Sequence, residues 1–352
     1  MAARARTQRP PFEVGATAVP AGTRTTVDLP VSMLSDHTPV TMSMHVIHGR
    51  KPGPVMFVSA AVHGDEVIGV EIVRRLLRSP ALDRISGTLL VVPIVNTFGF
   101  LNQSRYLPDR RDLNRSFPGS PGGSLAARLA LLFMTEIVER ADCGIDLHSA
   151  AVQRTNLPQC RVSTGDAQAL AMARAFGAPV ILTSREREGS LRAASRARGV
   201  TTIVYEAGEG LRFEETGVRA GVAGILRVMH AQGMISTRGV PKTRTAPFVC
   251  HSSRWERAPA GGLFRAFQKR GAHVEEGALL GVVSDPFGEV ERPVTASQSG
   301  IIVGRANLPV VNEGDALFHI ARIPASVDGE AWAEAVSEQL DGDPLFDEDE
   351  II

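Results

Sequence analysis

The chain of 352 residues is poor in aromatic side chains and carries no surplus of either charge. Aromatic residues make up 5% of it, too few for the stacking platforms on which proteins bind single-stranded nucleic acid. Lys+Arg and Asp+Glu number 38 each, so no net charge favours nucleic acid or an anionic membrane as partner. The 43% of hydrophobic residues is ordinary for a globular protein, and the length of 352 residues suits one large domain plus a smaller one.

Cysteine is scarce, and long apolar segments are absent. Three scattered cysteines form no CxxC pair, which argues against a disulfide framework and against a thiolate zinc site. No apolar run reaches the roughly 18 residues of a membrane span. The basic N-terminus lacks the apolar stretch of a secretory signal, so we expect a cytoplasmic protein. No GxGxxG or GxxxxGK[ST] loop follows the first strands, which makes a nucleotide-binding protein a weak interpretation.

Apolar runs that suit buried strands alternate with segments of helical periodicity between about residues 25 and 235. This alternation predicts an α/β fold with a mixed, mainly parallel sheet flanked by helices. After about residue 240, short apolar runs separated by Gly, Pro, Asp and Glu predict a smaller C-terminal all-β domain. We therefore expect a flexible arm at 1–22, a catalytic domain at 23–240, the all-β domain at 241–325 and an acidic tail at 326–352, with a short helix at 331–340.

A histidine and a carboxylate follow the first buried run. His63 and Glu66 stand in HGDE, between a strand and a helix, where ligands bind in an open parallel sheet. His148 ends a second short strand and could complete the two-histidine, one-carboxylate set of a catalytic zinc ion. Asp146 lies on the same strand face as His148 and could orient a ligand, while Gly64 would allow a tight turn.

Other polar residues could serve the reaction and the substrate. Glu206 ends a further strand and is the candidate general base for a metal-bound water. Asn114 and Arg115 lie in a loop, and an arginine pairs well with a substrate carboxylate. Arg105 precedes that loop and could stabilise an oxyanion. Each of these residues could also be an ordinary strand-end or surface side chain.

Four segments occur in an order that resembles the succinylglutamate desuccinylase/aspartoacylase family: HGDE at 63–66, DLNRSFPG at 112–119, DLH at 146–148 and YEAG at 205–208. The family is similar to the zinc carboxypeptidases, and the resemblance covers about residues 25–235. It implies a zinc-carboxypeptidase-like fold with one zinc ion per chain, bound by His63, Glu66 and His148.

The resemblance also implies the roles of the remaining residues. Glu206 is the general base and proton shuttle, Arg105 polarises the scissile carbonyl, and Asn114 and Arg115 hold the substrate carboxylate. The spacer at 106–111 holds extra residues relative to the aspartoacylase pattern, so Arg110 or Arg111 is an alternative to Arg105. The segment at 150–161 looks like that of bacterial deacylases of the family, with Asn156 and Arg161 as candidate substrate contacts.

The C-terminal domain resembles a biotinyl/lipoyl-type β domain in its spaced glycines. No Met-Lys-Met attachment site lies between Ala296 and Val311, so no carried cofactor is expected. We expect this domain to narrow the site entrance or to form a contact in a homo-oligomer.

These observations predict a zinc-dependent deacylase that hydrolyses the amide bond of a small N-acylated amino acid or related carboxylate. A zinc carboxypeptidase acting on short peptides is one alternative, because the same zinc ion and Asn-Arg pair would serve it. A non-catalytic metal- or metabolite-binding protein is another. Glu206 counts against the latter, since binding alone needs no general base.

Overall fold

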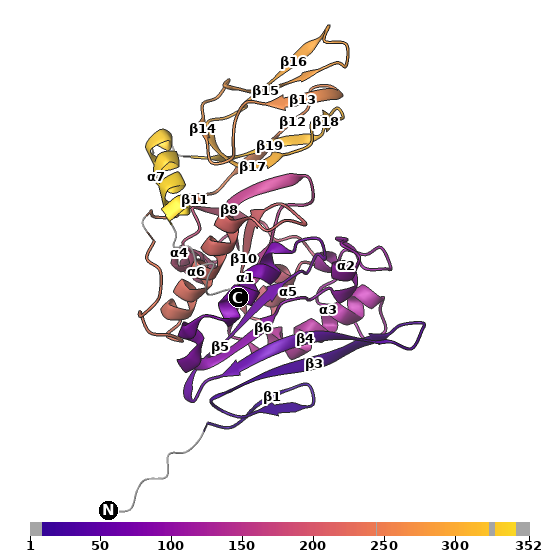
Figure 1. The fold of residues 1–352 in the computed structure, drawn as a ribbon, viewed down its shortest axis with the longest axis vertical. Coiled ribbons are helices and arrows are strands. Elements are labelled where there is room, and N and C mark those ends of the chain that lie inside the picture. Colours follow the sequence, from indigo (N-terminus) through magenta and orange to yellow (C-terminus); the bar gives the residue numbers. More distant parts are fainter. Residues whose placement is uncertain (1–8, 244, 324–327, 343–352) are drawn as a thin grey trace, which may run out of the picture.

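The computed structural model describes residues 9–243, 245–323 and 328–342. One large sheet runs through the molecule and includes strands from both its N-terminal and its C-terminal parts (Figure 1). Its main path runs through β12 (Ser253–Arg257), β19 (Ala316–Arg322), β17 (Gly300–Ala306), β8 (Arg154–Ser163), β10 (Thr201–Gly208), β7 (Cys143–His148), β5 (Lys51–Ala60), β6 (Ser86–Val92), β4 (Pro39–His48) and β3 (Thr23–Met33). Beside this path, β9 (Val180–Ser184) pairs with β8, and β11 (Phe248–Cys250) pairs with β9.

The centre of this sheet is parallel. Strands β6, β5, β7 and β10 run in one direction, and every residue of β7 is buried. Strands buried on both faces need apolar residues at nearly every position, which is why their segments read as continuous apolar runs. Antiparallel strands flank this centre, with β3 and β4 on one side and β8 on the other. The predicted mixed sheet flanked by helices is confirmed, and its parallel part is the centre.

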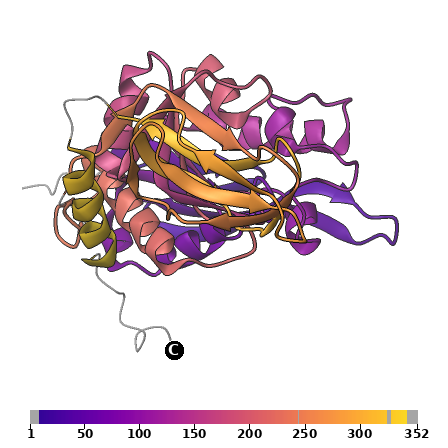
Figure 2. The ribbon, with the colours of Figure 1, turned by 90° about the horizontal axis from the view of Figure 1, so that it is seen from above.

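Helices cover both faces of the sheet (Figure 2). On one face α1 (Ile68–Leu77), α4 (Ala167–Phe176) and α6 (Glu215–Ala231) build a core that includes Phe176 and Tyr205. On the other face α2 (Thr97–Leu101), α3 (Leu125–Glu136) and α5 (Leu191–Ala197) build a core that includes Phe57 and Phe133. The short 3-10 helices are η1 (Pro80–Arg84), η2 (Leu113–Arg115) and η3 (Val138–Arg140).

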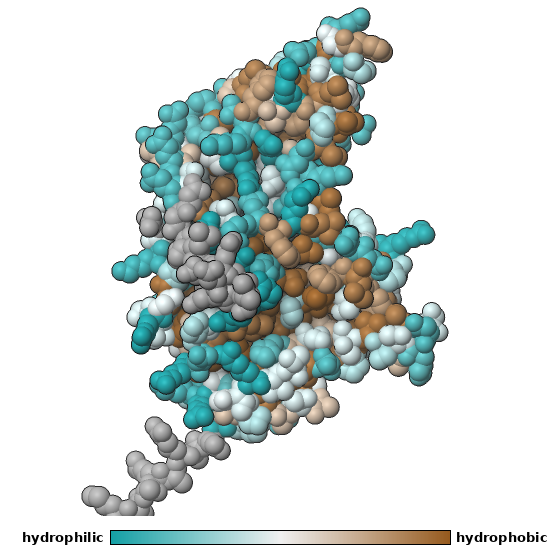
Figure 3. All heavy atoms as spheres, in the orientation of Figure 1, coloured by the Kyte–Doolittle hydropathy of each residue, from teal (hydrophilic) through white to brown (hydrophobic). Residues whose placement is uncertain are grey.

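The C-terminal β region, residues 248–323, has its own core around Phe264, Phe318 and Ile320. A separate sheet in the order β16 (Glu291–Thr295), β15 (Leu279–Ser284), β13 (Gly262–Ala266) and β18 (Val310–Val311) forms its outer layer. Short β14 (His273–Val274) pairs with β17. This region exposes Leu263, Phe287 and Val310, and apolar residues are visible at the top of Figure 3.

Strand β17 of the C-terminal β region pairs directly with β8 of the catalytic part, in a register that places Gly304 opposite Asn156. The all-β region therefore extends the large sheet. Sequence periodicity identifies strands but not which edges pair, so this junction was not visible in the chain itself.

One segment differs from its predicted structure, and one predicted helix is confirmed. Residues expected in the flexible arm form a hairpin of β1 (Phe12–Val14) and β2 (Thr17–Val19), because Val14 and Val19 are buried in the core. The predicted C-terminal helix is found as α7 (Gly329–Gly342), and the acidic tail beyond it lies outside the described residues. Among the described residues, no helix is both long and apolar enough to cross a membrane.

Candidate active site

Three neighbouring parallel strands bring the predicted metal ligands and the candidate base together. His63 follows β5, His148 ends β7, and Glu206 lies opposite His148 on β10. Carboxyl ends of parallel strands meet at one edge of a sheet, where ligands bind in open α/β folds. His63, Glu66 and His148 are buried there, with their ligand atoms within 4.8 Å of one another. We call these three residues the metal triad.

Each histidine of the triad faces a carboxylate at both ring nitrogens. Glu66 Oε1 lies 2.7 Å from His63 Nδ1, and Glu66 Oε2 lies 2.6 Å from His148 Nδ1. On the far side, His63 Nε2 lies 3.0 Å from Asp112, and His148 Nε2 lies 2.7 Å from Asp146. An Nε2–H that donates to the outer carboxylate leaves the Nδ1 lone pair for a metal ion.

The charges of the triad support each other despite deep burial. Burial by itself would lower the pKa of His63 and His148, but the adjacent carboxylates raise both pKa values above the ordinary histidine value. Burial would raise the pKa of Glu66, but the two histidines lower that pKa well below its usual range. The site thus accommodates positive charge among ionised carboxylates. Two histidines and one carboxylate are a ligand set of catalytic zinc, so the residues fit the expected ion.

The turn that delivers His63 is made differently from the prediction. Ala61, directly after β5, adopts a left-handed φ of 51°, and its carbonyl accepts a hydrogen bond from the Asn96 amide at 2.9 Å. Gly64 is needed for space instead: a Cβ there would lie 1.9 Å from the backbone carbon of Gly99 in α2. The close approach of α2 therefore requires the glycine, while Ala61 carries the turn.

A cavity of about 540 Å³ opens onto the triad, a size that suits a small molecule. Its lining is strongly basic. Seven arginines contribute to it: Arg105, Arg115, Arg154, Arg161, Arg185, Arg187 and Arg192. The carboxylates in the lining are Glu66, Asp146 and Glu206. We call this space the active-site cavity.

Arg105 is the arginine beside the metal triad. Its Nη1 lies 3.3 Å from Glu66 Oε1, and its Nη2 lies 3.0 Å from Asp112 Oδ2. The alternatives Arg110 and Arg111 are exposed and do not line the active-site cavity. The geometry therefore favours Arg105 for any role at the reacting carbonyl.

Asn114 and Arg115 line the same cavity from η2. The Asn114 Oδ1 accepts a hydrogen bond from the Leu191 amide at 2.9 Å, which ties the loop to the start of α5. Burial lowers the pKa of Arg115; Asp112 opposes this shift, and Arg187 and Arg105 add to it. Repulsion among these cations would be relieved by an anion in the cavity.

Asn156 and Arg161, the expected substrate contacts, both contact Glu206 from β8. Asn156 Nδ2 donates to Glu206 Oε2 at 2.7 Å, and Arg161 Nη2 lies 2.9 Å from the same oxygen. Both residues also line the active-site cavity. The polar ends of both side chains therefore contact the candidate base.

Several lining residues were missed by sequence analysis. Trp255 comes from β12 of the C-terminal β region; its ring stacks on His319 at 4.7 Å and lies 5.5 Å from the guanidinium of Arg154. Arg192 donates to Ser184 Oγ at 3.2 Å, while its buried Nη1 has no hydrogen-bond partner among the described residues. The one available signal was the arginine-rich segment at 185–192, between a strand and a helix.

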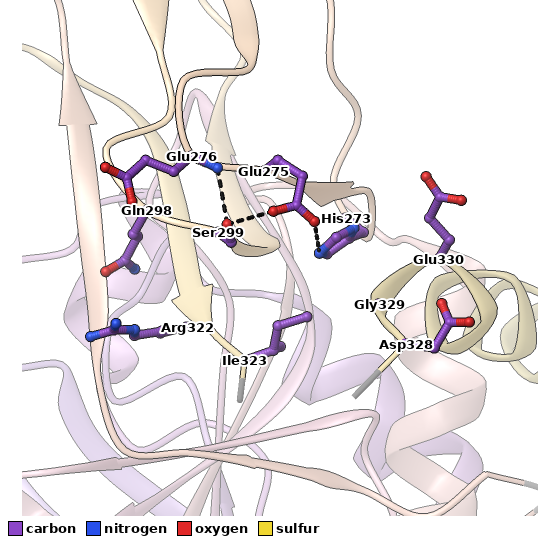
Figure 4. Close-up of a pocket in the computed structure, with 10 residues that line it drawn as sticks. All are labelled: His273, Glu275, Glu276, Gln298, Ser299, Arg322, Ile323, Asp328, Gly329 and Glu330. Carbon is purple, nitrogen blue, oxygen red and sulfur yellow. Dashed lines mark hydrogen bonds and ion pairs between the residues drawn. The ribbon is translucent and has the colours of Figure 1, made fainter. Parts of the chain in front are cut away.

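A larger cavity of about 770 Å³ lies between the C-terminal β region and α7 (Figure 4). Its acidic lining residues Glu275, Glu276, Asp328 and Glu330 are exposed. Glu275 is already engaged, accepting a hydrogen bond from Ser299 at 2.7 Å. Among the described residues, the metal triad is the histidine and carboxylate group compact enough to hold an ion. We therefore take the smaller cavity as the active site.

Known proteins are similar to this chain in both sequence and fold. The catalytic domain of the succinylglutamate desuccinylase/aspartoacylase family matches residues 52–232, just over half of the chain. An N-alpha-acetyl-L-2,4-diaminobutyric acid deacetylase from Halomonas elongata is 26% identical over 292 residues, which cover 79% of this chain and 85% of that enzyme.

Two solved structures show the likeness in three dimensions. A succinylglutamate desuccinylase/aspartoacylase from Rhodobacter sphaeroides is 26% identical in sequence, with a TM-score of 0.75. The match covers 86% of this chain and 96% of that protein. The product-bound ectoine utilization protein EutE (DoeB) from Ruegeria pomeroyi shares the fold, with a TM-score of 0.78 at 23% identity over 90% and 100% of the two chains. The chain therefore belongs to the succinylglutamate desuccinylase/aspartoacylase family, whose members are amide-hydrolysing enzymes.

Proposed function

We propose that this protein is a zinc-dependent deacylase that hydrolyses the amide bond of a small N-acylated amino acid. The observation that carries the proposal is the buried metal triad at the floor of an arginine-lined cavity, with Glu206 in the same lining. Family membership supports amide hydrolysis, and the relative from Halomonas elongata acts on an N-acetylated amino acid.

The metal triad would hold one zinc ion, which when bound lowers the pKa of a water molecule and polarises a carbonyl group. Glu206 accepts a proton from the attacking water on a carboxylate oxygen and then delivers it to the leaving amine. Arg105 donates a hydrogen bond toward the carbonyl oxygen as negative charge develops there. Burial of the triad keeps bulk water away from these charges and strengthens their interactions.

Asn114 and Arg115, which line the same cavity, hold the carboxylate of the substrate. The fork of a guanidinium pairs with a carboxylate through two parallel hydrogen bonds and so fixes its orientation. The basic lining favours substrates with negative charge, and its size of about 540 Å³ favours a single amino-acid derivative over a long peptide.

The test compares zinc-loaded wild type with Glu206→Gln on N-acetyl and N-succinyl amino acids and on dipeptides. Wild type should release free amine from the N-acyl amino acids, and the variant should retain zinc but lose at least about 100-fold in kcat. Cleavage of dipeptides alone would identify a carboxypeptidase. Bound zinc without cleavage of either substrate class would identify a binding protein. Full activity in Glu206→Gln would exclude Glu206 as the base.

A further inference from the structure

The candidate base is held through one of its two oxygens. Two side chains among the described residues donate to Glu206, the Asn156 amide at 2.7 Å and the Arg161 guanidinium at 2.9 Å, and both contact Oε2. A carboxylate held on one oxygen keeps the other available to accept a proton in a fixed direction. Asn156 is the neutral member of this pair, and its burial at 5% exposure leaves it little freedom.

Asn156 lies in β8 between two strands that both place a glycine opposite it. Gly208 of β10 is on one side, and Gly304 of β17 in the C-terminal β region is on the other. A Cβ on Gly304 would lie 2.8 Å from Asn156 Oδ1, closer than such atoms approach. Because Gly304 has no side chain, the Asn156 amide has room to lie where it donates to Glu206.

A second residue of the C-terminal β region fixes the backbone at the same point. Arg270, between β13 and β14, donates from Nη1 to the Asn156 carbonyl at 3.1 Å and to Thr155 Oγ1 at 2.6 Å. Its guanidinium also pairs with Glu214, the residue before α6. The strand that carries Asn156 is thus held by strand pairing and by a charged side chain from the same region.

We propose that Asn156 is a positioning residue for Glu206, and that Gly304 of the C-terminal β region keeps open the space that this role needs. The inference rests on the proposed function, because it takes Glu206 as the base. It gives the C-terminal β region a part in catalysis and assigns Asn156 to the base instead of to the substrate.

The first test separates a positioning role from substrate contact. Asn156→Ala, and Asn156→Leu, which keeps a similar size but has no N–H donor, should each lower kcat about 10- to 100-fold, the factor for one hydrogen bond to a charged group. KM should stay within about twofold, since the lost interaction acts on the transition state. A raised KM with unchanged kcat would make Asn156 a substrate contact and overturn the proposal.

The second test addresses Gly304. Gly304→Ala should lower kcat about 10-fold with KM and zinc content unchanged, because the atom displaced is the end of the Asn156 side chain. In the Asn156→Ala background the same substitution should cost nothing more, since the clash is gone. Gly261→Ala is the matched control: its added Cβ would meet no atom closer than 3.7 Å, and wild-type kinetics are expected. Additive losses in the double variant would overturn the proposal.

A crystal structure of Gly304→Ala provides a readout that needs no activity. Asn156 Nδ2 should lie beyond hydrogen-bond distance of Glu206 Oε2, and an intact contact would refute the role of Gly304. Glu206→Gln in the same assays keeps the two proposals apart. If Glu206→Gln is inactive while the Asn156 variants match wild type, only the positioning role fails. If Glu206→Gln stays active, Glu206 is not the base and the positioning role fails with it. If wild type cleaves no N-acyl amino acid, the proposed function itself fails.

Discussion

On the side away from Glu66, His148 contacts Asp146 and His63 contacts Asp112. These two carboxylates are held in place in different ways. Asp146 is buried and accepts a hydrogen bond from Ser59 at 2.8 Å. Asp112 accepts from Arg105 and also from the Asn114 backbone amide at 2.8 Å. Asp112 therefore connects the metal triad to the loop proposed to bind substrate. Asp112 lies inside the motif at 112–119, but His63, which it contacts, is 49 positions away in the chain. The sequence alone therefore indicated no role for Asp112.

Asp112→Asn should weaken zinc binding about 10- to 100-fold, because the amide holds the orientation and basicity of His63 less well than the carboxylate does. Competition titration with a zinc chelator measures the affinity. Asp109→Asn, in the same loop but bonded to backbone amides at 111 and 126, is the control and should bind zinc like wild type. Unchanged affinity in Asp112→Asn would show that the contact with His63 is incidental.

Arg192 is the residue that most strongly indicates a further negative group on the substrate. Its Nη1 is buried without a partner among the described residues, and burial, with repulsion from Arg161, lowers its pKa. Arg192→Gln should raise KM about 10- to 100-fold for an N-acyl amino acid with a second carboxylate and leave kcat nearly unchanged. Steady-state kinetics on N-acetylated acidic and neutral amino acids measure the difference. Arg196→Gln, exposed on the same helix, should have no effect; equal KM values for wild type and Arg192→Gln would contradict the assignment.

At the scale of elements, helices were easier to predict than polar strands. Helix α4 begins and ends at residues whose types favour those places: the Asp166 side chain caps its start, and Gly177 ends it in a left-handed conformation. Strand β8 was missed because its residues do not alternate between polar and apolar in a strand pattern. It is nevertheless buried along most of its length, between β10, β9 and β17. Polar residues of a strand beside a site can be buried because they bond to other side chains of the site. Hydrophobic periodicity does not predict such strands.

Gly64→Ala tests the packing of α2 against the turn that carries His63. The added methyl group would collide with backbone atoms of Gly99 and Phe100 that cannot move freely, so the free energy of unfolding should fall by at least about 3 kcal/mol. Gly122→Ala is the control, because nothing lies within 4 Å of its added Cβ, and a change within about 0.5 kcal/mol is expected. Urea denaturation measures both. Similar stabilities of the two variants would mean that the turn is not tightly packed.

At the scale of the whole molecule, the large sheet joins the catalytic part to the C-terminal β region. Trp255 of that region lines the active-site cavity. Gly304 of the same region lies opposite Asn156 in the neighbouring strand. The expectation that the region shapes the site entrance agrees with Trp255 in the cavity lining. Oligomeric contacts through its exposed apolar residues stay a prediction.

If the metal triad binds zinc as proposed, removing the ion should destabilise the whole fold, because the unfolded chain cannot assemble the triad. At free zinc about 100-fold above its Kd, the stabilisation amounts to about 2.7 kcal/mol. Thermal unfolding with and without a chelator should therefore show a lower Tm in the chelated sample. His148→Ala should unfold at the same Tm under both conditions. A chelator effect of equal size in His148→Ala would place the ion elsewhere.

Local patterns in the chain were enough to predict the residues at the strand ends, including the metal triad and the candidate base, and the parallel core. Those features are local: each depends on a strand, a turn and the side chain that follows. The contacts of Asn156 with Glu206 and of Asp112 with His63, and the approach of the C-terminal β region to the site, became visible in the folded chain alone. These are contacts across strand edges and between distant loops. A linear pattern holds no record of which edges meet, because pairing is settled by packing in three dimensions.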